Sequence, residues 1–199
     1  PDMGAHEWYS EVLGCTDESA CNYNADANSD DGSCEYGLCA SSQRDITLNA
    51  GFNLVSFHVI PEDSTVGSIL SPLGDNAVSL LGEGLAATNT DNGWIGSLTH
   101  IEHDDGYWMF VNAVDTLNLI GISIPPDQSY ALHEGFNLIS YPFLECGNIS
   151  EVLPDDVEDC ITAILGEGMA GINTDNGWQG GLQSLCPDDG YWFSNQCDD

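Results

Sequence analysis

The sequence contains one pattern twice, and the two copies are offset by 84 residues. The matching segments are GFNL at 51–54 and 135–138, GEG at 82–84 and 166–168, NTDNGW at 89–94 and 173–178, and DDGYW at 104–108 and 188–192. The copies align without a gap from Leu48 and Leu132 onward. Such a repeat indicates a duplicated structural unit. The repeated residues are mainly glycine, asparagine, aspartate and aromatic residues, which are typical of turns and strands rather than of a catalytic site.

The charge of the chain excludes several classes of function. It has 33 acidic residues, one arginine (Arg44) and no lysine, which gives a formal net charge of −32. Binding to nucleic acid or to anionic lipid needs many cationic side chains, so neither is expected. Catalysis by lysine is excluded as well. A charge this negative repels itself unless salt or bound cations screen it.

Hydrophobic residues make up 42% of the chain, which predicts a packed core rather than disorder. The cysteines are even in number and include no C-x-x-C pair, which favours disulfides over a zinc site. Disulfides in turn indicate an extracellular or cell-surface location. They are Cys15, Cys21, Cys34, Cys39, Cys146, Cys160, Cys186 and Cys197. No apolar run is long enough to cross a membrane, so no membrane insertion is expected.

The composition divides the chain into three segments. Residues 1–43 are rich in Cys, Asp, Asn and Ser and form an N-terminal arm with a small disulfide-rich module. Residues 44–125 form the first repeat and residues 126–199 the second. We therefore expect a small module followed by two tandem domains.

The sequence of each repeat predicts mainly β-structure. In the first repeat, residues 51–60 alternate with apolar side chains on both faces, which predicts an interior strand. Residues 64–70 predict one or two helical turns capped by Ser64 or Thr65. Further strands are predicted at 77–81, after the Asn92-Gly93 turn, at 107–111 and at 116–124. Five or six short strands and one short helix indicate a compact β-sandwich or barrel-like domain.

Two resemblances extend this interpretation. The segment from Gly14 to Cys34, with its C-T-D, A-x-N-Y and D-D-G-S-C elements, resembles a thrombospondin type-3-like calcium-binding repeat of secreted and surface proteins of marine and Bacteroidetes-type bacteria. The 84-residue unit resembles a β-rich accessory module of large bacterial extracellular proteins, marked by an early G-[WF]-N-L-[IV]-S strand and a late G-Y-W strand. Both resemblances imply an extracellular setting, and neither implies catalytic residues.

Calcium is the cofactor that the N-terminal module suggests, because oxygen ligands alternate along a loop that ends in glycine. The candidate ligands are Asp17, Asn22, Asn24, Asp26, Asn28, Asp30 and Asp31. The spacing differs from an EF-hand loop, since Gly32 falls one place late and no glutamate stands at the twelfth position. The alternative is a solvated acidic loop held only by disulfides.

Other candidate sites have simpler structural interpretations. Asp91, Asp175 and the Asp-Asp pairs at 104–105 and 188–189 recur with the repeat, and we interpret them as turn residues rather than calcium ligands. His100 and His103 form an H-x-x-H pair that the second repeat lacks, and two ligands do not make a zinc site.

The repeated tryptophans have two possible roles. Trp108 and Trp192 lie in predicted strands, and we expect them in the core. Trp94 and Trp178 follow an exposed turn, so they either join the core or stack against a sugar ligand.

The second repeat ends before the residues that would match the closing strand of the first, and we expect it to be short by one strand. Residues 1–13 carry Trp8, Tyr9, Val12 and Leu13 and are predicted to be a free arm. We hypothesise that this arm completes the second repeat of a neighbouring copy, which would build a head-to-tail filament. The alternative is that Cys197 ties the end down, for example to Cys186, without any added strand.

These observations predict a non-enzymatic, secreted structural protein of the bacterial cell surface. Calcium and disulfides would stabilise it, and it would assemble with itself into a filament or matrix. The alternative is an adhesin or a carbohydrate-binding module of a larger secreted protein, with surface glycans as partners. No nucleophile motif of an enzyme is present, so no catalytic residue is proposed.

Overall fold

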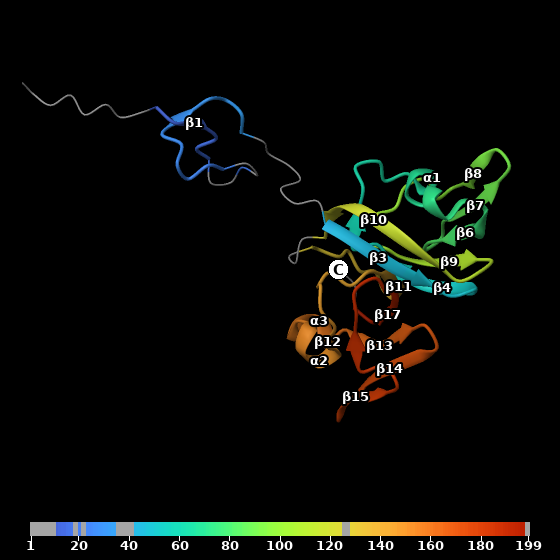
Figure 1. Ribbon diagram of the computed structural model, residues 1–199. Helices are drawn as coiled ribbons and strands as arrows, with labels where there is room; N and C mark the ends of the chain where they lie inside the picture. Colours follow the sequence, from blue (N-terminus) through green and yellow to red (C-terminus); the bar gives the residue numbers. More distant parts are fainter. Residues whose placement is uncertain (1–10, 18–19, 21–22, 35–41, 125–127, 198–199) are drawn as a thin grey trace, which may run out of the picture. The chain divides into compact units, whose positions relative to one another are not determined.

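The computed structural model describes residues 11–17, 20, 23–34, 42–124 and 128–197. The chain divides into two compact units, residues 1–41 and 42–199, and both repeats belong to the second unit. The fold is mainly β with short helices, as predicted (Figure 1). Among the described residues, no helix is long and apolar enough to span a membrane.

The N-terminal unit is a small module around a disulfide between Cys15 and Cys34. Strand β1 (Leu13–Gly14) pairs in parallel with β2 (Ser29–Asp30). The backbone of Val12 accepts hydrogen bonds from the amides of Asn28 and Ser29. The prediction of a free arm is therefore wrong for Val12 and Leu13, which the backbone pairing holds in the module. Trp8, Tyr9, Cys21, Asn22 and Cys39 lie outside the described residues.

The first repeat is a sandwich of two sheets. Its five-stranded sheet has the order β4-β9-β6-β7-β8, and the three-stranded sheet β3-β10-β5 packs over it. The strands are β3 (Ser42–Leu48), β4 (Gly51–Ser56), β5 (Val59–Ile60), β6 (Ala77–Leu81), β7 (Ala86–Thr90), β8 (Gly93–Gly96), β9 (Gly106–Val111) and β10 (Asp115–Ser123). Helix α1 (Val66–Ile69) and the 3₁₀ segment η1 (Ser71–Asn76) cover the rest of the core.

Local sequence signals explain several of these elements. Thr65 caps α1 by accepting a hydrogen bond from the amide of Ser68, as predicted. The predicted Asn92-Gly93 turn joins β7 to β8, and Gly93 adopts a positive φ of 94°. Strand β10 buries Leu117 and Leu119 against the five-stranded sheet, which confirms the predicted closing strand.

The second repeat has a matching five-stranded sheet, β11-β17-β13-β14-β15. It lacks, among the described residues, the three-stranded sheet of the first repeat. Its elements are β11 (Gly135–Ile139), β12 (Gly147–Asn148), α2 (Ile149–Val152), α3 (Asp155–Glu158), β13 (Ile161–Gly166), β14 (Met169–Thr174), β15 (Gly177–Gly180), β16 (Ser184–Leu185) and β17 (Tyr191–Asn195). The small sheet β12-β16 packs beside α2. Among the described residues, no strand of the second repeat occupies the position that β10 has in the first.

The copies differ by one residue around the first helix. The caps of α1 and α2 are Thr65 and Asn148, which are 83 residues apart, whereas the sheets keep the offset of 84. The gap-free alignment is therefore wrong in this segment. The second repeat has one residue fewer before α2 and one residue more between the start of α2 and β13.

Candidate functional site

The two repeats join at a seam in which most contacts occur twice, 84 residues apart. The seam comprises residues 54–56, Glu83 and residues 104–106 of the first repeat, and residues 138–140, Glu167 and residues 188–190 of the second. The amide of Leu54 donates to Glu167 Oε2 at 3.0 Å, and the amide of Leu138 donates to Glu83 Oε2 at 2.9 Å. These reciprocal bonds give the repeated GEG turn a clear role, because each glutamate caps a strand of the other repeat.

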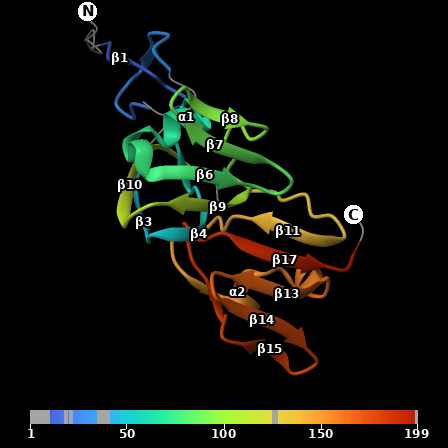
Figure 2. The ribbon, with the colours of Figure 1, turned by 90° about the vertical axis from the view of Figure 1, so that its right-hand side faces the viewer.

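Backbone pairing extends across the same seam. The amide of Ser56 donates to the carbonyl of Asp188 at 2.8 Å, and that of Ser140 donates to the carbonyl of Asp104 at 3.0 Å. Val55 forms an antiparallel bridge with Asp189, and Ile139 forms one with Asp105. Figure 2 shows β9 of the first repeat beside β11 of the second. The end of each edge strand, β4 or β11, is therefore paired on both sides.

This pairing corrects two sequence interpretations. Strand β4 lies at the edge of its own sheet rather than in the interior. Its Leu54 is nevertheless buried, and it lies next to Gly190 of the second repeat. Asp105 and Asp189 form bridges between the repeats rather than simple turns. Their carboxylates each accept a hydrogen bond from a tyrosine of the following strand, Tyr107 or Tyr191. Burial raises the pKa of both carboxyl groups above the usual range.

We expect Glu83→Ala and Glu167→Ala each to cost about 1–3 kcal/mol of unfolding free energy, because each leaves a part-buried strand amide without its acceptor. Urea denaturation measures this loss. Glu145→Ala, at an exposed loop position, is the matched control and should change little. Equal effects of all three substitutions would contradict the assigned role.

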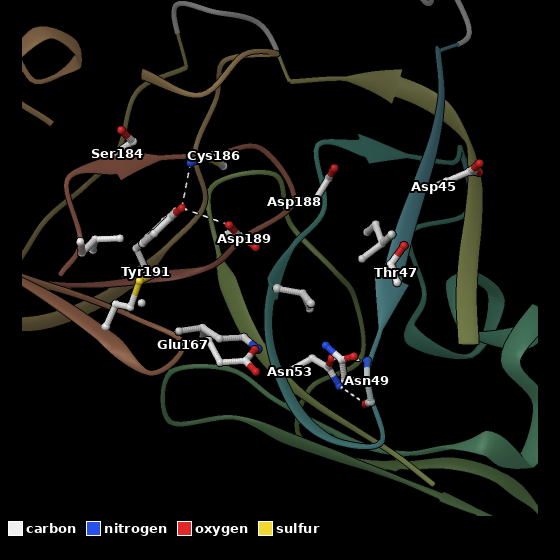
Figure 3. A pocket seen from close by; sticks show the side chains of 16 residues that line it. Asp45, Thr47, Asn49, Asn53, Glu167, Ser184, Cys186, Asp188, Asp189 and Tyr191 are labelled. Carbon is white, nitrogen blue, oxygen red and sulfur yellow. Dashed lines mark hydrogen bonds between the residues drawn. The ribbon is translucent and has the colours of Figure 1, made fainter. Parts of the chain in front are cut away.

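An acidic pocket of about 390 Å³ opens on one side of the seam (Figure 3). Its lining includes four carboxylates, those of Asp45, Glu167, Asp188 and Asp189. In Figure 3, Glu167 extends from the second repeat towards the strand that carries Asn53. Asp188 has a positive φ of 69° and forms an ion pair with Arg44. Burial raises the pKa of Asp188, although the Arg44 guanidinium acts in the opposite direction.

The seam is not symmetric at the glutamates. His133 Nε2 lies 2.7 Å from Glu83 Oε1. In the first repeat the residue that corresponds to His133 is Asn49, which lines the pocket together with Glu167. The pocket lining has four carboxylates and no cationic side chain, which disfavours anions and favours groups that donate hydrogen bonds.

His58 is a buried histidine whose protonation is expected to destabilise the fold. Its side chain is 1% exposed, and neither ring nitrogen has a hydrogen-bond partner. Burial lowers its pKa, as do the nearby charges of Arg44 and His103, while the backbone of Tyr141 acts in the opposite direction. The pKa of His103 is lowered too, mainly by burial. Such histidines stabilise the fold above their ordinary pKa of 6.5, and this stabilisation is lost as the pH falls from 6.5 through the folded pKa.

We therefore expect His58→Phe to lose less stability than the parent between pH 8 and pH 5.5. Each unit by which burial lowers the histidine pKa corresponds to about 1.4 kcal/mol. Urea denaturation at both pH values measures the difference, with the exposed His100→Phe as control. An unchanged pH dependence in His58→Phe would contradict the expectation.

A second cavity, an apolar groove of about 290 Å³, lies within the second repeat. Its lining residues are Gln128, Tyr130, Leu132, Ile139, Ser140, Tyr141, Pro142, Phe143, Val152, Leu153, Pro154, Val157, Leu185 and Phe193. None of these residues is charged. The Tyr130 hydroxyl lies 3.0 Å from Ser140 Oγ, and burial raises the pKa of Tyr130 to about 12.

Comparison of the chain with protein-family models, with curated proteins and with solved structures finds no match.

The candidate calcium ligands of the N-terminal module mostly take part in local turns. Asn24, Asp30 and Asp31 accept hydrogen bonds from the amides two residues further on, and Asn28 accepts one from Val12. Asp17 and Asp26 are described as well, whereas Asn22 is not. Within the described ranges, no group of three or more His, Cys, Asp or Glu side chains is placed to hold a metal ion. Calcium binding stays a prediction.

The structure places Trp94 and Trp178 with the core, which is one of the two roles left open for them, and overturns the core prediction for Trp108 and Trp192. Trp178 is 8% exposed and belongs to the core, where its indole nitrogen donates to Glu158. Trp94 is half-buried and packs against the first core. Trp108 and Trp192 are half-buried on the other face, where they contact Phe52 and Phe136 edge to face. The core prediction is wrong for this second pair because Tyr107 and Tyr191 take the inward positions.

The described disulfides in the second repeat join Cys146 to Cys186 and Cys160 to Cys197. The suggested pairing of Cys197 with Cys186 is therefore wrong. Cys160 and Cys197 lie at the positions of Asn76 and Ala113 in the first repeat. There, the Asn76 side chain makes two hydrogen bonds with the backbone of Ala113. The disulfide thus replaces a side-chain link at the same junction.

Proposed function

We propose that this chain is a non-enzymatic structural protein of the cell surface that assembles with itself into an extracellular filament or matrix. The supporting observation is that the polar residues shared by the two repeats contribute to the scaffold. Asn53 and Asn137 close the turns before β4 and β11, Asn89 and Asn173 hold the strand ends, and the GEG glutamates join the repeats. These scaffold roles of the shared residues support a structural function.

The proposal includes the finer organisation of the chain. The repeats would act as two tandem sandwich-like domains that the seam fuses into one unit. The N-terminal module would bind calcium through the seven predicted oxygen ligands, and bound calcium would screen part of the net charge of −32. The disulfides are compatible with an extracellular location.

Electron microscopy and light scattering of the purified chain, with calcium and with chelator, test this function. We expect filaments or large oligomers in calcium that dissociate when chelator is added. A monodisperse monomer under both conditions, over a wide range of concentration, would contradict the proposal.

A carbohydrate-binding role is the second candidate, because aromatic side chains are exposed on the outer face of both sheets. Phe52 is 52% exposed and Phe136 is 51% exposed, and each contacts a half-buried tryptophan. Aromatic faces on a rigid sheet can stack on sugar rings. Glycan-array binding that is lost in Phe52→Ala and Phe136→Ala, and kept in Ile95→Ala, would support this role over assembly.

A further inference from the structure

The apolar groove of the second repeat corresponds to the part of the first repeat that β10 closes. With the offset of 84, the groove residues Leu132, Tyr141, Phe143, Leu185 and Phe193 match Leu48, Phe57, Val59, Ile101 and Met109. In the first repeat these five residues form one core with Leu117 and Leu119 of β10. Among the described residues, the groove is thus the same core without a covering strand.

The backbone beside the groove is also open. In the first repeat, β10 pairs with the whole of β3 and with β5. The residues that match β3 in the second repeat include 128–132, which belong to no sheet among the described residues. Tyr130 and Leu132 are half-buried while Ser129 and Ala131 are exposed, which is the alternation of a strand. An unpaired segment of this kind can take an added strand.

The lining defines the chemistry of the occupant. Since the groove has no charged residue, a charge on the inward face of the occupant would be buried without a partner. Strand β10 shows the pattern that fits, because Leu117 and Leu119 are buried while Asn118 and Ile120 are exposed. Two aliphatic side chains separated by one residue are therefore the minimum requirement.

We propose that this groove is the docking site for a β-strand supplied by another polypeptide, with aliphatic side chains at alternate positions and an uncharged inward face. The inference rests on the proposed assembly function, because it supplies the contact by which one chain joins the next. The strand adds beside residues 128–132 and completes the core of the second repeat as β10 completes that of the first.

A labelled peptide with the sequence of residues 115–123 is the probe, and fluorescence anisotropy with the full chain measures its binding. We expect saturable binding of one peptide per chain, because the first repeat already contains its own strand. Replacing the inward Leu117 and Leu119 of the peptide by Asp should weaken binding by about tenfold or more. Replacing the outward Ile120 by Asp should have little effect.

Variants of the protein locate the site. Phe143 lines the groove and is 39% exposed, so Phe143→Asp should fold and weaken peptide binding. Ile172→Asp, on the outer face of the same repeat, is the matched control and should bind normally. Appending the sequence of residues 115–123 after Asp199 should fill the groove within the chain and abolish peptide binding. The proposal would be overturned if the peptide does not bind, or if its affinity is unchanged by the substitutions of Leu117 and Leu119 in the peptide and of Phe143 in the protein.

The two proposals can fail separately. Filaments that persist while the peptide does not bind would overturn strand docking and leave the structural function intact. A monomeric chain that binds the peptide as described would support the docking site and contradict self-assembly. Binding of a peptide of residues 1–10 at the same groove would identify the chain's own N-terminal segment as a donor and support both.

Discussion

Replacing Gly106 and Gly190 by alanine together is expected to separate the two repeats. A Cβ at Gly106 would lie 2.8 Å from the carbonyl oxygen of Ile139, and one at Gly190 would lie 2.7 Å from that of Val55. These neighbours are backbone atoms of paired strands, so the clash cannot be relieved by rotating a side chain. We expect each substitution to cost about 3 kcal/mol, at the upper end of the usual range for overpacking.

Urea denaturation and limited proteolysis measure this effect. The double variant should unfold in two steps, because the repeats lose the contacts that couple them. Gly67→Ala is the matched control, since its Cβ would meet only Trp94 at an ordinary distance of 3.6 Å, and alanine favours the helix there. A double variant that unfolds in one step with unchanged stability would show that the repeats are joined elsewhere.

Removing the Cys160–Cys197 disulfide of the second repeat is expected to have the second large effect. The two cysteines are 37 residues apart, and closing a loop of this length stabilises a fold by about 4 kcal/mol in the chain-entropy model. Cys160→Ala with Cys197→Ala should therefore lower the unfolding free energy by about that amount. Because the seam couples the two repeats, denaturation monitored in either repeat should show the same shift of the transition.

The first repeat suggests how to recover part of this loss. Cys160→Asn with Cys197→Ala installs the pair found as Asn76 and Ala113, whose hydrogen bonds hold the matching junction. We expect this variant to be more stable than the double alanine variant by about 1–2 kcal/mol. Equal stabilities of the two variants would contradict the equivalence of the junctions.

Local patterns in the sequence predict the elements of the fold well. The Thr65 cap, the strand at 77–81, the Asn92-Gly93 turn and the closing strand β10 depend on residues near one another in the chain, so spacing and turn chemistry suffice. The position of the open groove follows partly from the sequence as well, because the repeat indicates which strand to compare.

The seam could not be predicted in this way. Glu167 and Leu54 are 113 residues apart, and no periodicity connects a turn glutamate with a distant strand amide. The only signal was the recurrence of Glu between two glycines in both copies, at a turn where any polar residue would serve.

The faces of the DDGYW strand were also ambiguous. Alternation predicts that Tyr and Trp point to opposite sides, but both are large aromatic residues that suit a core. The structure assigns the core to Tyr107 and Tyr191, whose hydroxyls accept hydrogen bonds from the amides of Glu102 and Cys186. Those backbone donors come from loops that the sequence pattern does not place.

Reciprocity at the seam has a consequence for the behaviour of the protein at high concentration. Each repeat carries both the glutamate that caps its partner and the strand that is capped, so the contacts are the same whether the two repeats belong to one chain or to two. Exchange of repeats between chains, a domain swap, therefore needs no new surface. The closed form prevails while the protein is more dilute than the effective concentration of the tethered repeats, about millimolar for a short connection. Above that concentration, exchanged repeats would link chains through the same contacts.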